Sequence, residues 1–392
     1  MPSQDHSQAT AATQPGDWRT RLRQGLVIPA CPLMLHEDGR WSPRYQRGVM
    51  RYYLHAGAGG IAVGVHSTQF AIREPRHGLL EPVLRLVADE VDRYESENGG
   101  PPIVRIAGIC GRQEQALGEA RLATRLGYHA GLLSLTAVGG DGEAAMLEHA
   151  RAIGDQIPLI GFYLQPAVGG RVLSFDFWRR FCEIPAVVAI KIAPFNRYQT
   201  LDVVRAVIAS GRGDIALYTG NDDNIIADLL TPFDLDGQRR WIVGGLLGQW
   251  GVWTRRAVEL LEQLQAARGD REAVGDRETA GKHDAATEQP SPGDSVTIAL
   301  DWLAKNAQLT DANAAVFDAA NGFAGCIPGI LEALRRQGLA PSRRCLDPAE
   351  VLSPGQAAEL DRVSRAYPWL LDDEFVARHL VSWLDSPDEP VA

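Results

Sequence analysis

Short apolar runs recur along the first two thirds of the chain, and each is followed by a stretch with apolar residues at helical spacing. Such regular alternation predicts parallel strands that are joined by helical crossovers. Eight units of this kind that close on themselves form a (β/α)8 TIM barrel, which belongs to the α/β class. The eight runs are Leu26–Ala30, Gly60–Gly64, Ile103–Ala107, Ala130–Leu135, Leu159–Tyr163, Val187–Pro194, Ile215–Tyr218 and Trp241–Gly244.

A doubly wound open sheet is the alternative that the same alternation allows. Such a sheet usually has fewer strands, and no Gly-x-Gly-x-x-Gly motif follows the first apolar run of this chain. The pattern therefore favours the closed barrel.

Composition divides the chain into four parts. Residues 1–17 are rich in Ser, Gln, Thr and Ala and lack an apolar core, which predicts a disordered tail. The barrel is predicted over residues 18–265. Residues 266–295 are charged and contain Gly and Pro, which predicts a flexible insertion. Residues 296–392 regain apolar positions at helical spacing and predict a C-terminal helical extension of the barrel, with a frayed end.

Charge and cysteine content narrow the classes of function. The formal net charge of −10 and the pI near 5.4 argue against a nucleic-acid-binding surface. The five cysteines are scattered without a Cys-x-x-Cys pair or metal-ligand spacing, which is typical of reduced thiols in the cytoplasm. No apolar run reaches the roughly 18 residues that would span a bilayer. We expect a soluble, cytoplasmic protein that binds a small molecule and neither nucleic acid nor membrane.

The sixth apolar run contains a lysine, Lys191. The chain has only three lysines (Lys191, Lys282 and Lys305), so 36 of its 39 basic residues are arginines. Burial disfavours the ammonium form and lowers the pKa of a lysine. A neutral lysine amine is a nucleophile that forms a Schiff base with a carbonyl group. A lysine at a strand end can also extend its amine to solvent, and this run alone leaves both interpretations open.

Further polar side chains follow the predicted strands at their carboxyl ends, where catalytic residues of a barrel gather. Strand alternation puts Leu159, Gly161 and Tyr163 on one face of the fifth strand. If this face points inward, the Tyr163 phenol and the Lys191 amine meet over one reacting carbon. The other candidates are His66, Ser67 and Thr68 after the second strand, Asp222 after the seventh, and Gly244 at the end of the eighth.

These residues resemble the dihydrodipicolinate synthase / N-acetylneuraminate lyase family of class I (Schiff-base) lyases. That family has a Tyr-x-x-Pro element after strand five and a lysine in an Ile-Lys context in strand six. The matching residues here are Tyr163-Leu164-Gln165-Pro166 and Ile190-Lys191, and the separation of 28 residues (191 − 163) is the one expected of the family. The resemblance covers about residues 25–260 and extends to the C-terminal helices.

The resemblance implies roles for the candidate residues. Lys191 would form an imine with a 2-oxo acid, and Tyr163 would carry the proton as general acid and base. The loop with His66, Ser67 and Thr68 would hold the substrate carboxylate. Gln165 and Arg171 are candidates for substrate selection because they lie in the loop after Tyr163, and not because of the resemblance. Asp222 and Gly244, at the ends of strands seven and eight, are further substrate-binding candidates. The family needs no cofactor or metal, and its members form homo-oligomers, either dimers or tetramers.

The chain also departs from the family pattern. Val65 and His66 occupy the positions of the paired hydroxyl residues in the carboxylate loop. Val168 stands where relatives that make dihydrodipicolinate carry an arginine, and a Leu-Thr-Ala segment from Leu135 replaces their Pro-Tyr-Tyr. We therefore expect no lysine-biosynthetic activity. The sequence predicts an aldolase-type lyase that acts on pyruvate or a larger 2-oxo acid. A dehydratase of a 2-oxo-3-deoxy sugar acid and a non-catalytic barrel that serves as a binding partner are the alternatives.

Structural roles remain possible for several candidates. Tyr163 can be a core tyrosine with a satisfied hydroxyl, and His66 can be a structural loop histidine. Asp222 and Asp223 match in type the acidic pair that contacts sugar hydroxyls in the sialic-acid lyase branch. They can equally cap the helix that follows them.

Overall fold

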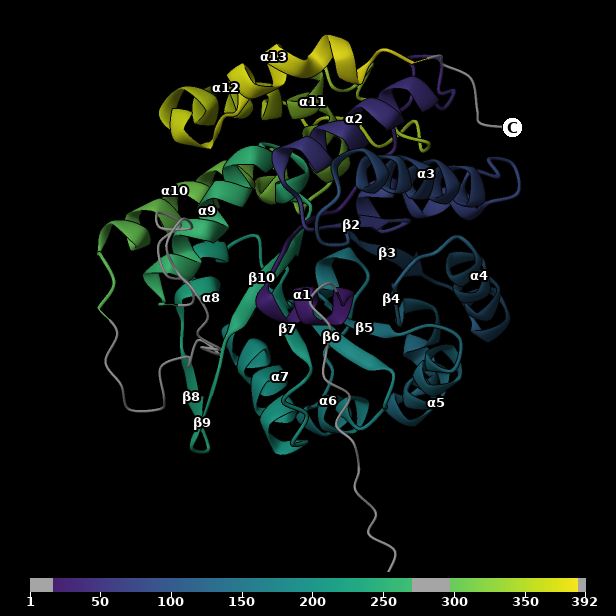
Figure 1. Cartoon of the computed structure of the whole chain (residues 1–392), viewed down its shortest axis with the longest axis vertical. Coiled ribbons are helices and arrows are strands. Elements are labelled where there is room, and N and C mark those ends of the chain that lie inside the picture. Colours follow the sequence, from purple (N-terminus) through teal and green to yellow (C-terminus); the bar gives the residue numbers. More distant parts are fainter. Residues whose placement is uncertain (1–16, 270–296, 387–392) are drawn as a thin grey trace, which may run out of the picture.

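The computed structural model describes residues 17–269 and 297–386. Its centre is a sheet of eight parallel strands in the order β1-β10-β7-β6-β5-β4-β3-β2, with helices around it (Figure 1). The strands are β1 (Val27–Pro29), β2 (Gly60–Val63), β3 (Val104–Ile109), β4 (Ala130–Leu133), β5 (Leu159–Leu164), β6 (Val187–Ala193), β7 (Ala216–Thr219) and β10 (Ile242–Leu247). Each of the eight predicted runs contains or overlaps one of these strands.

The first and second strands close the sheet into a barrel. A parallel bridge joins Ala30 to Ala62, and the Cys31 N–H donates to the Ala62 carbonyl at 2.8 Å. Below this bridge the Gly59 N–H donates to the Val27 carbonyl at 3.1 Å. An open doubly wound sheet is therefore excluded, and the predicted (β/α)8 barrel with C-terminal helices is confirmed.

Eight helices follow the strands and cover the outside of the barrel. In α6, for example, the Ser174 hydroxyl caps the helix by accepting from the Phe177 N–H, and Phe177, Trp178 and Phe181 are buried against the sheet. The helices are α2 (Pro43–Ala56), α3 (Leu80–Asn98), α4 (Gln113–Arg125), α5 (Glu143–Gly154), α6 (Phe175–Cys182), α7 (Arg197–Ala209), α8 (Ile225–Leu230) and α9 (Thr254–Ala267).

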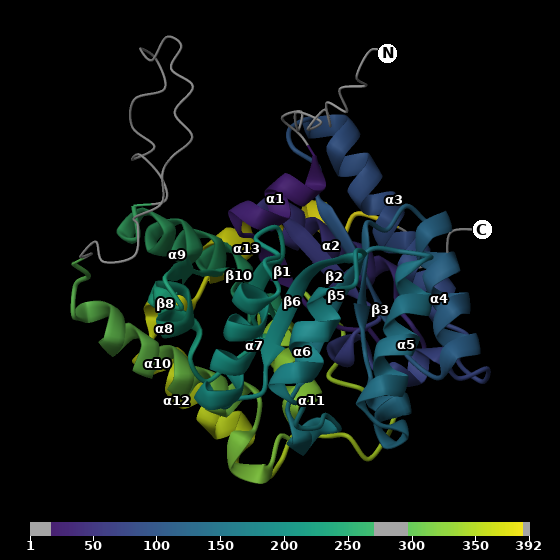
Figure 2. The same cartoon turned by 90° about the horizontal axis from the view of Figure 1, so that it is seen from below.

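Two cores result from the alternation of side chains along the strands. One lies between the strands and the helices, and the other fills the barrel interior with residues such as Ile28, Ile106, Ile160 and Tyr218. A short helix that the sequence did not predict, α1 (Trp18–Gln24), closes the amino-terminal end of the barrel, where the Tyr218 hydroxyl donates to the Leu22 carbonyl at 2.7 Å. In Figure 2, α1 lies at one end of the barrel and α11 at the other.

Four helices of the C-terminal part pack on the barrel. They are α10 (Asp301–Val316), α11 (Cys326–Arg336), α12 (Gln356–Ala366) and α13 (Asp373–Trp383). Helix α10 lies along α8, and α13 lies along α2. A small hairpin of β8 (Phe233–Leu235) and β9 (Gln238–Arg240), which the sequence did not predict either, precedes β10.

Several predictions fall on residues outside the described ranges. Residues 1–16, 270–296 and 387–392 contain nearly all of the predicted tail, insertion and frayed end. Helix α9 continues to Ala267, which is two residues into the predicted insertion. Within residues 17–269 and 297–386, no helix is both long and apolar enough to cross a bilayer.

Candidate active site

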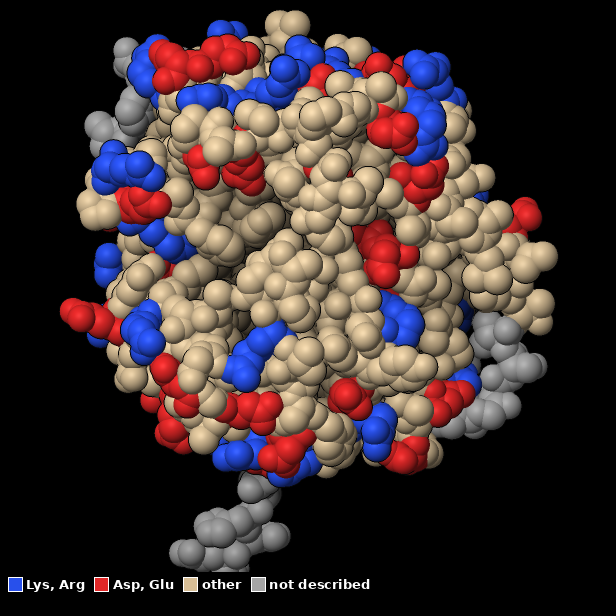
Figure 3. All heavy atoms as spheres, turned by 180° about the vertical axis from the view of Figure 1, so that it is seen from behind, with Lys and Arg blue, Asp and Glu red and all other residues tan. Residues whose placement is uncertain are grey.

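A cavity of about 90 Å³ lies at the carboxyl ends of the barrel strands. Lys191 reaches it from β6, and Phe162 and Leu164 reach it from β5. The C-terminal helical part covers it with four side chains, Phe317, Phe323, Cys326 and Ile330. On the face shown in Figure 3 the molecule is hollowed near its centre, and uncharged side chains border the hollow.

Lys191 lines this cavity and is half-buried. Its Nζ lies 4.5 Å from the centroid of the Phe162 ring, and the two residues are register partners in the β5–β6 ladder. Burial lowers the pKa of Lys191 from 10.5 to about 8, although the nearby Asp222 carboxylate acts in the opposite direction. A substantial fraction of this lysine is therefore a neutral amine at mildly alkaline pH.

Gly220, directly after β7, gives the lysine its space. A Cβ at this position would lie 2.6 Å from the Lys191 Cε and 2.8 Å from the Ala193 Cβ. These separations are shorter than van der Waals contact, so any larger residue here would displace the lysine side chain.

Asp222 is the acidic group of the cavity. Its Oδ1 is buried and has no hydrogen-bond partner. Burial raises the pKa of Asp222 to about 7, while the positive charge of Lys191 lowers it and Asp223 raises it further. The exposed Asp223 side chain does not line the cavity.

A network of polar side chains fixes the loop that carries Asp222. The buried Asp228 carboxylate accepts from the Thr219 hydroxyl at 2.6 Å and from the Asn221 amide at 2.9 Å. Asn221 in turn accepts from the Phe195 N–H at 3.0 Å, which joins the loops after β6 and β7. From α10, the Asn313 amide donates to the Asp222 carbonyl at 2.7 Å. The C-terminal extension therefore helps to hold the site.

The loop after β2 contributes only part of what the sequence predicted. His66 and Ser67 line the cavity, and burial lowers the pKa of His66 to about 4, so its imidazole is neutral. The Ser67 hydroxyl donates to the Ala30 carbonyl at 2.9 Å. Thr68 lies outside the cavity, because its hydroxyl donates to the Cys31 carbonyl at 2.7 Å and accepts from the Gly64 N–H at 3.0 Å. Thr68 therefore holds the loop to β1.

Tyr163 does not face Lys191. The alternation prediction was right that Leu159, Gly161 and Tyr163 share a face, but this face points outward to α6. The Tyr163 ring lies 5.1 Å from that of Trp178, and its hydroxyl donates to the Leu173 carbonyl at 3.3 Å and accepts from the Leu173 N–H at 3.2 Å. Phe162, which has no hydroxyl, occupies the inward position. The expectation that a phenol meets the amine is therefore wrong.

Two further candidates are separated by the structure. Gln165 lines the cavity at the end of β5. Gly244 lies below it inside the barrel, where a Cβ would be 2.5 Å from the Leu26 carbonyl oxygen and 2.9 Å from the Tyr218 ring. Gly244 therefore allows close packing of β10 and does not line the candidate site, contrary to its prediction as a substrate-binding residue.

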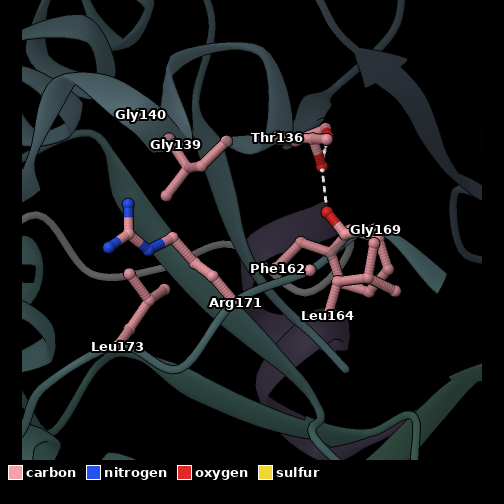
Figure 4. Close-up of a pocket in the computed structure, with 11 residues that line it drawn as sticks. Thr136, Gly139, Gly140, Phe162, Leu164, Gly169, Arg171 and Leu173 are labelled. Carbon is pink, nitrogen blue, oxygen red and sulfur yellow. Dashed lines mark hydrogen bonds between the residues drawn. The ribbon is translucent and has the colours of Figure 1, made fainter. Parts of the chain in front are cut away.

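A second cavity of about 330 Å³ adjoins the first and shares Phe162 and Leu164 with it. Figure 4 shows Arg171 and Leu173 on one side and the hydrogen bond from the Thr136 hydroxyl to the Gly169 carbonyl, 3.1 Å long, on the other. The exposed Arg171 runs past Gly139 along this cavity. The residues beside Lys191 thus have room for a ligand larger than the first cavity holds.

The sequence missed several lining residues. Phe162 is the neighbour of Tyr163, the residue that the sequence analysis selected. Nothing in the sequence of β5 shows that Tyr163 packs outward on Trp178. Phe323, Cys326 and Ile330 come from a segment whose place on the barrel has no local sequence signal. Within residues 17–269 and 297–386, no three or more His, Cys, Asp or Glu side chains gather in a way that could hold a metal ion.

Comparison with known proteins shows a shared fold. No family model matches the chain, and no curated protein matches its sequence. Solved structures do match. A dihydrodipicolinate synthase from Cyanidioschyzon merolae with lysine bound has a TM-score of 0.63 and 18% identity, over 88% of this chain and 99% of that one. An N-acetylneuraminate lyase from Fusobacterium nucleatum has a TM-score of 0.62 and 14% identity, over 88% and 99%.

A third similar structure is YagE from E. coli K12, a prophage protein of the dihydrodipicolinic acid synthase family, in complex with pyruvate. Its TM-score is 0.62 and its identity 15%, over 87% of this chain and 98% of that one. At these identities the similarity shows the fold alone. The resemblance inferred from the sequence is thus confirmed at the level of the fold.

Proposed function

We propose that this protein is a divergent Schiff-base lyase of the dihydrodipicolinate synthase / N-acetylneuraminate lyase type. One observation carries the proposal: the amine of the half-buried Lys191, whose pKa is lowered to about 8, lies in a cavity at the carboxyl ends of the barrel strands. This is the place and the state that a nucleophilic lysine requires.

The reaction begins when the neutral Lys191 amine attacks the 2-oxo group of the substrate. Loss of water gives an imine, whose protonated form withdraws electrons from the adjacent carbon. A C–C bond at the next carbon can then break to give an enamine and an aldehyde. His66, as a neutral imidazole, has one N–H with which it can bind the substrate carboxylate.

The two cavities indicate how a substrate would divide between them. The first, at about 90 Å³, accommodates a pyruvyl group beside Lys191. The second, at about 330 Å³, accepts the remainder of a larger 2-oxo acid near Thr136 and Arg171. We therefore propose an aldolase that acts on pyruvate or a larger 2-oxo acid and does not make dihydrodipicolinate. Assembly into dimers or tetramers and a cytoplasmic location remain predictions from the sequence.

Turnover of a panel of 2-oxo-3-deoxy sugar acids tests this function. We expect the purified protein to release pyruvate and an aldehyde, which NMR spectroscopy detects together. A dehydrated oxo acid without pyruvate would show a dehydratase. No turnover of any 2-oxo acid in either direction would contradict a lyase and leave the non-catalytic barrel.

A further inference from the structure

We propose that Asp222 is the catalytic acid–base of this site and takes the part for which the sequence suggested Tyr163. The inference rests on the proposed Schiff-base function. Neither aromatic residue at the end of β5 can act as an acid or base in the cavity. Phe162, opposite Lys191, has no ionisable proton, and the Tyr163 hydroxyl lies outside the cavity and is hydrogen-bonded to the Leu173 backbone. Imine chemistry needs a group that moves protons at the carbon beside the imine.

Asp222 has the geometry for this task. It enters the cavity from the loop after β7, the strand next to the one that carries Lys191. Its Oδ1 is enclosed and makes no hydrogen bond to the described protein, so this atom is available to a substrate. A buried carboxyl oxygen without a hydrogen-bond partner lowers the stability of the folded protein, so a purely structural role does not explain it.

Helix α10 anchors the backbone around Asp222. Asn313 from α10 donates to the Asp222 carbonyl, and the Thr310 hydroxyl donates to the Asp223 carbonyl at 2.7 Å. The adjacent Asn221 is fixed by Asp228. A loop anchored on both sides, with a carboxylate that has a free oxygen, is the arrangement that a general base requires.

Three other titratable groups face this cavity, and none is as well suited. Burial lowers the pKa of His66 to about 4, which makes it a weak base. Burial raises the pKa of the Cys326 thiol well above its usual range, so the thiol keeps its proton. Lys191 is consumed by the imine. Asp222, with a pKa raised to about 7 by burial, is the group closest to the pH at which proton transfer is efficient.

The proton balance can be followed step by step. Lys191 adds to the 2-oxo carbon, the N–C bond forms, and the carbonyl oxygen becomes a hydroxyl with the proton from the amine. The protonated Asp222 gives its proton to this hydroxyl, which leaves as water, and the iminium ion and the Asp222 carboxylate remain. The carboxylate then takes a proton from the carbon next to the iminium carbon, which yields the enamine and restores the protonated Asp222.

Exchange of the pyruvate methyl protons for deuterium isolates the last step. The intact protein is incubated with pyruvate in D2O and followed by NMR, and the adduct is trapped separately with borohydride after long incubation. We expect wild-type protein to exchange the methyl protons and to form the adduct. Asp222→Asn should lower the exchange rate about 10²-fold or more but still yield adduct. Asp155→Asn, at an exposed residue outside both cavities, should match wild type, and Asp222→Glu should keep measurable exchange.

The outcomes separate the two proposals. If wild type gives neither adduct nor exchange, the Schiff-base function itself fails, and the role of Asp222 fails with it. If wild type gives both and folded Asp222→Asn exchanges as fast as wild type, the function stands and the role of Asp222 is wrong. Adduct without exchange in the wild type would also overturn that role.

Discussion

Lys191 and Phe162 stand opposite each other in the β5–β6 ladder, with the lysine Nζ 4.5 Å from the centroid of the phenylalanine ring. Residues paired in neighbouring parallel strands point to the same side of the sheet, so both side chains face the barrel interior. The tyrosine that the spacing of 28 residues singled out is one position further along β5 and therefore points away. The pairing therefore places an aromatic ring, and not a phenol, beside the Lys191 amine.

The first prediction concerns the Tyr163 hydroxyl. Tyr163→Phe removes two hydrogen bonds to the Leu173 backbone, and we expect it to lower the free energy of unfolding by about 1 kcal/mol. Imine formation at Lys191 should change little, because the hydroxyl lies outside the cavity. Urea unfolding and borohydride trapping measure the two effects. Normal stability with a loss of trapping of about a hundredfold would show that Tyr163 acts in the chemistry after all.

The second prediction concerns the space beside Lys191. Gly220→Ala places a methyl group 2.6 Å from the Lys191 Cε, so we expect the rate of imine trapping to fall at least about tenfold. Gly118→Ala is the matched control, since a Cβ at that helical position meets no atom within 4 Å. The control should trap as wild type does. Equal rates for both variants would mean that the lysine does not need the space at Gly220.

The third prediction is the pH dependence of imine formation. The neutral amine of Lys191 is the reactive form, so the rate should rise with pH towards about 8, rather than towards the ordinary lysine value of 10.5. Above about 7 the Asp222 acid loses its proton, so this rise should level off and turn over. The Asp222 carboxylate holds the Lys191 pKa up, so Asp222→Asn should move this rise to lower pH. Trapping rates measured from pH 5 to 10 would contradict the prediction if the rise stayed near 10.5.

The fourth prediction is a gain in stability when the enclosed charges are removed. The pKa of Lys191 is lower in the folded than in the unfolded protein, so the charged ammonium reduces the free energy of unfolding. This reduction is complete below about pH 8 and disappears only as the pH approaches 10.5. The pKa of Asp222 is higher in the folded than in the unfolded protein, so the ionised carboxylate also reduces the free energy of unfolding. This second penalty grows from pH 3.8 to about pH 7 and is constant at higher pH. At pH 7.5 both penalties apply. We therefore expect the double variant Lys191→Met, Asp222→Leu to have a free energy of unfolding about 1–4 kcal/mol higher than that of wild type, as measured by urea denaturation.

This gain should shrink as pH is lowered towards 4, because the Asp222 penalty then disappears. A double variant that is less stable than wild type at pH 7.5 would show that the two groups stabilise the fold. In that case their position would need no functional explanation.

The strands could be predicted from sequence because a strand buried on both faces is marked by apolar residues alone. Every predicted run contains or overlaps a barrel strand. Helix α1 and the β8–β9 hairpin were missed because elements of seven and three residues carry too few positions for a periodic pattern.

The site was predictable in part for the same reason. Lys191 is conspicuous because a charge interrupts an apolar strand. Alternation shows which residues of β5 share a face with Tyr163, but it does not show which face points into the barrel. The packing of Tyr163 on Trp178 and the register of β5 with β6 determine the inward face. The cover from Phe323 and Ile330 could not be predicted, because where a helix docks depends on surfaces distant in sequence.

The most direct test is borohydride trapping with a panel of simple 2-oxo acids, followed by intact mass and peptide mapping. We expect one adduct per chain on Lys191, absent from Lys191→Met and retained in Lys305→Met. Lys305 is the control because its amine lies 4.7 Å from the centroid of the Trp302 ring on α10, outside both cavities. No adduct with any 2-oxo acid, or an adduct that survives in Lys191→Met, would contradict the Schiff-base function.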